Sequence, residues 1–203
     1  MDLSSIEILS AILNIDKNIN GGFMKKLWFM VLLLAMAGML MAEVIFEDGF
    51  ENGNTHNTAI AGWTQVSVSG SGVWTANDTL TNYNRTPRTG SWNAFLAYSN
   101  TDWMFKEVSL TAGTEYSLSF YARQDATSGT TIKASYGSAA TADGMTNEII
   151  AQTNVTNGDY QLFTGNFTPT TSGTFYIGIY ATLTYAPWYI SIDDISLVSI
   201  PLA

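Results

Sequence analysis

Two pairs of carboxylates lie near the two ends of the apolar-rich part of the chain. Glu47 and Glu51 stand in one short acidic segment, and Asp193 and Asp194 interrupt an apolar run near the C-terminus. Adjacent carboxylates repel one another and are costly to bury unless something neutralises them. Calcium, which takes about six to eight oxygen ligands, is the natural counter-ion for such a set.

The run around the second pair changes its apolar parity. Apolar residues fall at even positions before the pair, as at Ile190, and at odd positions after it, as at Ile195. Because side chains alternate between the two faces of a strand, this change predicts a β-bulge at Asp193-Asp194. First and last strands are often neighbours in β-sandwiches, so we expect the two acidic pairs to meet.

Other chemistry for these acids stays open at this stage. The carboxylates are exposed turn residues in one alternative, and a glycosidase-type acid pair in another. His56 is the only histidine. A Ser-His-Asp triad or a histidine metal site is therefore not expected.

Aromatic side chains are the second set of candidates, since the chain has 6 Trp and 10 Tyr. Tyr121 and Arg123 fall on the polar side of one predicted strand, and Tyr176 and Tyr180 on the polar side of another. If these strands are neighbours, the four residues form a patch for stacking and hydrogen bonding with a glycan, to which Trp188 can add. In the alternative, the tyrosines cover a sheet edge or lie under loops.

Period-two alternation recurs along the chain and predicts the elements that must position these residues. About ten short strands separated by Gly and Asn turns indicate an all-β fold, an antiparallel jelly-roll β-sandwich. The segment 139–150 is either a loop or a short helix that leads into a strand. The predicted strands are Val44–Glu47, Trp63–Val68, Gly72–Thr75, Asn93–Tyr98, Met104–Leu110, Tyr116–Arg123, Thr131–Tyr136, Tyr160–Phe167, Phe175–Tyr180 and Tyr189–Val198.

The N-terminal part of the chain predicts export. Residues 24–42 join a basic start to an uncharged apolar stretch, which is typical of the hydrophobic helix of a secretory signal peptide. Residues 1–23 are expected to be a mis-called or disordered extension, and residues 43–203 to form the jelly-roll domain. In the alternative, the apolar stretch stays uncleaved as an anchor.

Charge and cysteine content narrow the function further. The net charge is −9 and there is no cysteine. The negative charge argues against nucleic acid and anionic surfaces as partners, and it suits divalent cations and neutral glycans. Without cysteines, stability comes from packing, with or without a bound metal, rather than from disulfides.

The ends of the predicted domain resemble a known family. The segment Phe46–Gly53, followed by Gly62-Trp63 and closed by Trp188–Leu197, resembles cleaved-adhesin or choice-of-anchor J domains and is similar to CenC-type carbohydrate-binding modules. The resemblance implies a jelly-roll sandwich with structural calcium. It also implies that Glu47, Glu51, Asp193 and Asp194 are the calcium ligands.

Together these features predict a secreted, non-catalytic binding or adhesion module. Its expected partner is a glycan or a cell-surface protein, with no nucleic acid and no membrane contact once the signal is cleaved. One alternative is a purely structural or protein-interaction domain without a small ligand. A weaker alternative is a small glycan hydrolase.

Overall fold

The computed structural model describes residues 42–125, 129–184 and 186–201. Its strands belong to one compact unit, Ala42–Ile200, and these ranges contain no helix. No helix in the described ranges is therefore long and apolar enough to cross a membrane. The predicted extension over 1–23 and the predicted signal helix over 24–42 lie outside the described residues, Ala42 excepted.

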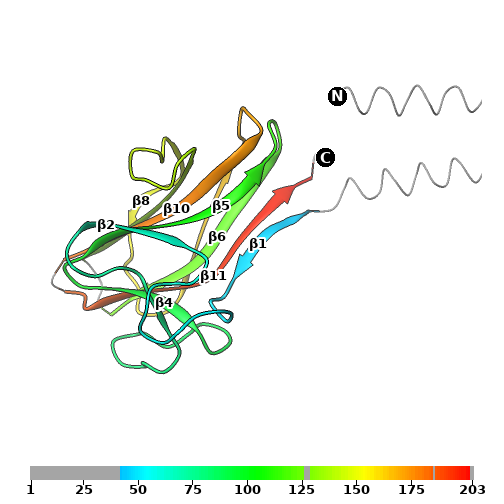
Figure 1. The fold of residues 1–203 in the computed structure, drawn as a ribbon. Coiled ribbons are helices and arrows are strands. Elements are labelled where there is room, and N and C mark those ends of the chain that lie inside the picture. Colours follow the sequence, from blue (N-terminus) through cyan, green and yellow to red (C-terminus); the bar gives the residue numbers. More distant parts are fainter. Residues whose placement is uncertain (1–41, 126–128, 185, 202–203) are drawn as a thin grey trace, which may run out of the picture. The chain divides into compact units, whose positions relative to one another are not determined.

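The described chain forms eleven strands in two antiparallel sheets (Figure 1). Sheet A has the order β3-β4-β11-β6-β9, with β1 also paired to β11, and sheet B has the order β2-β5-β10-β7-β8. The predicted all-β antiparallel sandwich is confirmed. The strands are β1 Val44–Asp48, β2 Thr64–Ser69, β3 Thr75–Asn77, β4 Asn93–Ala97, β5 Thr101–Leu110, β6 Glu115–Gln124, β7 Thr130–Gly137, β8 Asn147–Asn154, β9 Gln161–Phe167, β10 Gly173–Leu183 and β11 Tyr189–Ile200.

The hydrophobic core lies between the two sheets. Alternate residues of the long strands enter it, as Leu118 and Phe120 do from β6, and Ile177 and Ile179 from β10. All four are fully buried. Burial of such a side chain stabilises the fold by roughly 1.5–3 kcal/mol. The intervening residues of the same strands must therefore lie on the outer faces of the sheets.

The predicted bulge in the last strand is confirmed. The pairing of β11 with β6 shifts register between Asp193 and Ser196, and Asp194 has a positive φ of 49°. This single irregularity keeps Ile192 before it and Ile195 after it in the core. The alternation rule predicts this outcome, because only an extra residue can restore the inward direction.

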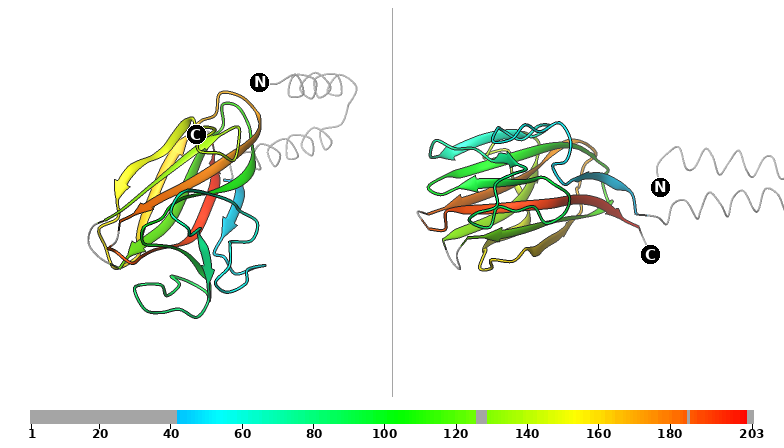
Figure 2. Two further views of the ribbon diagram at one scale, coloured as in Figure 1. Left: turned by 60° about the vertical axis from the view of Figure 1, so that its left-hand side comes forward. Right: turned by 90° about the horizontal axis from the view of Figure 1, so that it is seen from below.

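The first and last strands are neighbours, as expected. Val44 lies opposite Val198 and Asp48 opposite Ile195. β1 and β11 run side by side in both views of Figure 2. Residues 138–146 form a loop that leads into β8, so the loop rather than the short helix is observed in this segment.

Candidate functional site

Asp193 is the buried member of the paired acids. Its Oδ2 accepts hydrogen bonds from the backbone N–H groups of Arg88 at 2.7 Å and Thr89 at 3.2 Å. Its Oδ1 accepts one from the N–H of Asp194 at 2.8 Å. Burial raises the pKa of Asp193 to about 7, against the opposing effect of these hydrogen bonds. The carboxylate thus collects three backbone donors that would otherwise lack a partner there.

Asp194 is turned away from Asp193 by the bulge and contacts the same segment. Its Oδ2 accepts a hydrogen bond from Arg88 Nη1 at 2.7 Å, and its Oδ1 accepts one from Thr89 Oγ1. The Arg88 guanidinium also lies 3.4 Å from the centre of the Tyr121 ring. Arg88 therefore supplies the positive charge beside the two aspartates.

Glu51 holds the next part of this segment. Its Oε1 accepts hydrogen bonds from the N–H groups of Ser91 at 2.8 Å and Trp92 at 2.9 Å. Gly90, directly before these two residues, has a φ of 59°, and a Cβ added to it would lie 2.1 Å from Glu51 Oε1. A glycine is therefore required for the carboxylate to reach both donors.

These contacts hold a covering loop, residues 84–92, against the outer face of sheet A. Arg123 donates to the carbonyl oxygen of Thr86 at 2.6 Å, and Tyr160 Oη donates to the same oxygen at 3.0 Å. Ser191 Oγ donates to the carbonyl oxygen of Asn84 at 2.8 Å. Arg123, predicted to bind ligand, instead helps to hold this loop, as Tyr121 does through Arg88.

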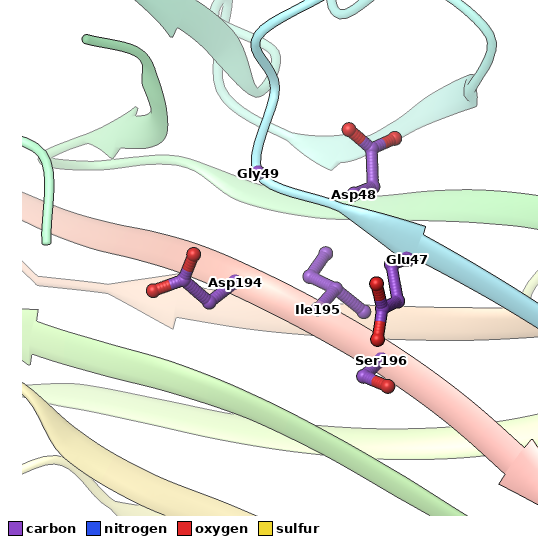
Figure 3. A pocket seen from close by; sticks show the side chains of 6 residues that line it. All are labelled: Glu47, Asp48, Gly49, Asp194, Ile195 and Ser196. Carbon is purple, nitrogen blue, oxygen red and sulfur yellow. The ribbon is translucent and has the colours of Figure 1, made fainter. Parts of the chain in front are cut away.

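Glu47 lies at the rim of a hollow of about 290 Å³ between β1 and β11. In Figure 3 its carboxylate stands beside Ser196, whereas the carboxylate of Asp194 lies further along β11, so the two do not converge on one point. Asp48 at the same rim accepts hydrogen bonds from Phe50 N–H and Trp63 Nε1, both at 2.8 Å. The hollow is lined by Glu47, Asp48, Gly49, Asp194, Ile195 and Ser196.

The four predicted calcium ligands do not form one donor set. Oxygens of Glu51, Asp193 and Asp194 face N–H or O–H donors, whereas calcium needs oxygens that face a common centre. Across the described residues there is no group of three or more His, Cys, Asp or Glu side chains that could hold a metal ion. Ligation by all four carboxylates therefore does not fit, and calcium stays a prediction.

The outer face of sheet B carries the other predicted binding residues. We call Trp103, Glu107, Lys133, Tyr176 and Tyr180 the sheet-B strip. Tyr180 of β10 lies opposite Trp103 of β5 and Lys133 of β7 in the strand register. The Tyr180 and Trp103 ring centres are 5.0 Å apart, and Lys133 Nζ lies 4.8 Å from the first and 5.0 Å from the second. Trp103 is buried, while Tyr180 and Lys133 are partly exposed, so the latter two form the surface.

The sheet-B strip ends in a polar pair, Tyr176 and Glu107, and Met145 packs against its centre at Gly178. Tyr176 Oη donates to Glu107 Oε2 at 3.0 Å, and this hydrogen bond raises the pKa of Tyr176. Between Tyr176 and Tyr180 stands Gly178, where an added Cβ would lie 2.6 Å from Met145 Sδ. The loop 138–146 therefore reaches onto this face through Met145.

The predicted patch that combined the polar sides of two strands is wrong. Tyr121 and Arg123 lie on β6 in sheet A, whereas Tyr176 and Tyr180 lie on β10 in sheet B. Trp188 directly precedes β11 and contacts the rings of Tyr83 and Tyr98.

Several residues were missed by the sequence analysis. Lys133 and Glu107 take part in the sheet-B strip, and their outward parity on predicted strands was a usable signal. Tyr83 lies outside every predicted strand, and Tyr98 ends the predicted strand Asn93–Tyr98 but follows the observed β4; both contact Trp188. No period could have placed those two together.

Comparisons with solved structures show where this fold occurs. A CBM61 module named TmCBM61, solved with β-1,4-galactotriose, has 17% identity and a TM-score of 0.54, covering 73% of this chain and 92% of its own. The K3 cleaved adhesin domain of Lys-gingipain from Porphyromonas gingivalis W83 has 15% identity and a TM-score of 0.57, covering 78% and 99%. At such identities the likeness shows the fold alone. No curated protein matches the sequence.

A third solved structure corrects one prediction. A cyclase from Fischerella sp. TAU has 17% identity and a TM-score of 0.56, covering 80% of this chain and 100% of its own. The prediction that this domain is not an enzyme is therefore corrected, because a cyclase has a similar fold.

The family itself is shown by the sequence match. The match spans residues 42–184, from before β1 to just after β10. It agrees with the resemblance to cleaved-adhesin and carbohydrate-binding modules that the ends of the domain indicated. The chain belongs to the family of carbohydrate binding domains.

Proposed function

We propose that this domain binds a neutral glycan on the outer face of sheet B. The observation that carries the proposal is the position of Tyr180. Its ring is partly exposed on a sheet face and is held between Trp103 and Lys133. The C–H groups of a sugar ring carry small positive charges and pack on the electron-rich face of such a ring.

The neighbours of Tyr180 suit the hydroxyl groups of a sugar. Lys133 offers N–H donors, Glu107 offers carboxylate acceptors, and the Tyr176 hydroxyl can do both. Because these groups stand on adjacent strands of one sheet, their spacing is set by the backbone pairing rather than by a mobile loop. The face can therefore meet a ligand with little loss of side-chain freedom.

Charge and family support a neutral ligand. The net charge of −9 weakens the attraction of polyanions over long distances. Membership in the carbohydrate binding domain family supports a glycan as the ligand class. The similar CBM61 structure was solved with β-1,4-galactotriose, which makes galactan a sensible first probe.

The proposal includes export of the domain. The basic start and apolar stretch over 24–42 support a secretory signal. The N-terminus of protein collected outside the expressing cells is expected to begin at Glu43. An intact N-terminus on protein retained inside the cells would contradict export.

A binding measurement with matched variants tests the site. Galactan, xylan and mixed-linkage β-glucan are offered to the wild type in affinity gel electrophoresis. Tyr180→Ala is expected to lower the affinity for the bound polysaccharide about tenfold, because it removes one central contact. The lower affinity is seen as weaker retardation in the gel. Tyr121→Ala is the control, because Tyr121 contacts Arg88 rather than the sheet-B strip. Equal binding by wild type and Tyr180→Ala would overturn this site.

A further inference from the structure

Three aromatic residues gather near the start of β11. Tyr83 and Tyr98 are 47% and 38% exposed, and Trp188 lies in contact with both. Ring centres are 6.2 Å apart for Tyr83 and Trp188, and 4.9 Å apart for Tyr98 and Trp188. We call these three residues the end platform. Large exposed rings that cluster are uncommon on a surface without a binding role.

The end platform is assembled from three segments that are distant in the sequence. Tyr83 lies in the long connection between β3 and β4, Tyr98 follows β4, and Trp188 precedes β11. The N–H of Tyr98 donates to the carbonyl oxygen of Trp188 at 2.7 Å, which ties two of the segments together. The backbones of Tyr98 and Trp188 are therefore held side by side.

The backbone at Tyr83 adopts an unfavourable conformation that surrounding contacts impose. Tyr83 and Asn84 both have positive φ, 56° and 54°. Two successive residues other than glycine in this region are costly and persist only when surrounding contacts impose them. Asn84 supplies those contacts, because its Nδ2 donates to Gln124 O at 2.9 Å and its carbonyl oxygen accepts from Ser191 Oγ at 2.8 Å.

A cation lies beneath these rings but is not offered to a ligand. The Arg85 guanidinium is 3.9 Å from the centre of Tyr189 and 5.1 Å from that of Phe95, and Arg85 is only 6% exposed. Tyr189 in turn contacts Tyr83, with ring centres 5.8 Å apart. Because Arg85 is buried and its guanidinium donates to Asn82, it offers no direct contact to a phosphate or an acidic sugar.

We propose that the end platform is a second glycan-binding site, one that takes a single neutral sugar ring. The planes of Tyr98 and Trp188 stand at 89° to each other, so the two rings do not form one flat surface for a long chain. The choice of a glycan as the ligand rests on the proposed function. The site itself is separate, because the end platform shares no residue with the sheet-B strip, which lies on β5, β7 and β10.

Exposed-ring variants test the end platform with galactan, xylan and mixed-linkage β-glucan in affinity gels. The double variant Tyr83→Ala/Tyr98→Ala is expected to lose about tenfold in affinity for the polysaccharide that the wild type binds best. Tyr83→Phe/Tyr98→Phe keeps the rings and should bind as the wild type does. Leu162→Ala is the control, since Leu162 is 48% exposed and lies on β9.

The outcomes separate the two sites. If the double alanine variant binds as the wild type does while Tyr180→Ala loses affinity, the end platform is overturned and the sheet-B site stands. If the wild type binds none of the three polysaccharides, both sites are overturned as glycan sites. If the double variant only abolishes self-association in sedimentation velocity, the end platform is a protein contact and the proposal fails. An unchanged far-UV circular dichroism spectrum and melting temperature exclude misfolding, and each single alanine variant should show part of the loss.

Discussion

On the outer face of sheet A, the Arg88 guanidinium lies 3.4 Å from the ring centre of Tyr121 and that of Arg123 lies 4.4 Å from Tyr160. On the outer face of sheet B, the Lys133 ammonium lies 4.8 Å from Tyr180. Both faces thus pair cations with tyrosines. In sheet A the pairs hold a loop, and in sheet B they form part of the surface. Residue type alone therefore does not distinguish a partly exposed face from a covered one.

The difference comes from the groups with which each face contacts a neighbouring loop. Sheet A presents the Asp193 carboxylate to the N–H groups of the covering loop, and Glu51 takes two more. Sheet B receives the loop 138–146 through Met145 near Gly178. Because carboxylates satisfy several backbone donors at once, they can fix a loop, whereas one apolar contact covers only a part of the face.

The largest expected effect is the loss of this loop attachment in Asp193→Ala. The substitution leaves three backbone N–H groups without their acceptor, so we expect the free energy of unfolding to fall by about 3 kcal/mol. Urea unfolding followed by tryptophan fluorescence measures the change. Affinity at the sheet-B strip should stay unaltered under native conditions.

Asp194→Ala is the matched control for this variant. Asp194 pairs with Arg88 nearer the surface, and such a pair contributes less than about 1 kcal/mol. If the two alanine variants were equally destabilised, the buried carboxylate would not be the main attachment of the loop.

A smaller effect is expected from Gly90→Ala. Glu51 must swing away from the new Cβ, which breaks its two backbone hydrogen bonds, and the positive φ of 59° adds strain. We expect a loss of about 2 kcal/mol in the free energy of unfolding. Gly113→Ala is the control, because its φ is 77° but nothing lies within 4 Å of the added atom, so only the strain of about 1 kcal/mol remains. Equal losses would show that the Glu51 contacts do not stabilise the loop.

The smallest effect is expected from calcium. Since Arg88 and backbone N–H groups already face the carboxylates, millimolar calcium or EDTA should shift the melting temperature by less than about 2 °C. Differential scanning calorimetry checks this at constant ionic strength with magnesium as the control ion. A rise of several degrees with calcium alone would instead support the predicted metal site. The carboxylates beside sheet A would then bind metal as well as hold the covering loop.

The framework of the fold was accessible from local sequence patterns. The alternation around Phe120 and Ile177 predicted strands, and the parity change at Asp193-Asp194 predicted the bulge. Both depend only on which residues within one strand must face the core. The prediction that the first and last strands meet is also confirmed.

The proposed binding surfaces could not be predicted in the same way, because they depend on which strands share a sheet. Tyr121 and Tyr180 have the same outward parity, yet β6 and β10 lie in different sheets. The covering loop is held by Glu51 and Asp193, which are far from it in sequence, and nothing in its own residues predicts the face that it covers. Tertiary pairing, rather than propensity, decided these points.

The pairing of β1 with β11 brings the entrance and the exit of the described domain together. Glu43 N–H donates to Ser199 Oγ at 2.8 Å, and Ser199 N–H donates to the carbonyl oxygen of Glu43 at 2.8 Å. A chain that enters before Val44 and leaves after Ile200 therefore does so within about one strand spacing. Such a domain can be spliced into a surface loop of a larger host, or carried as a side branch on it, without forcing the host's own ends apart.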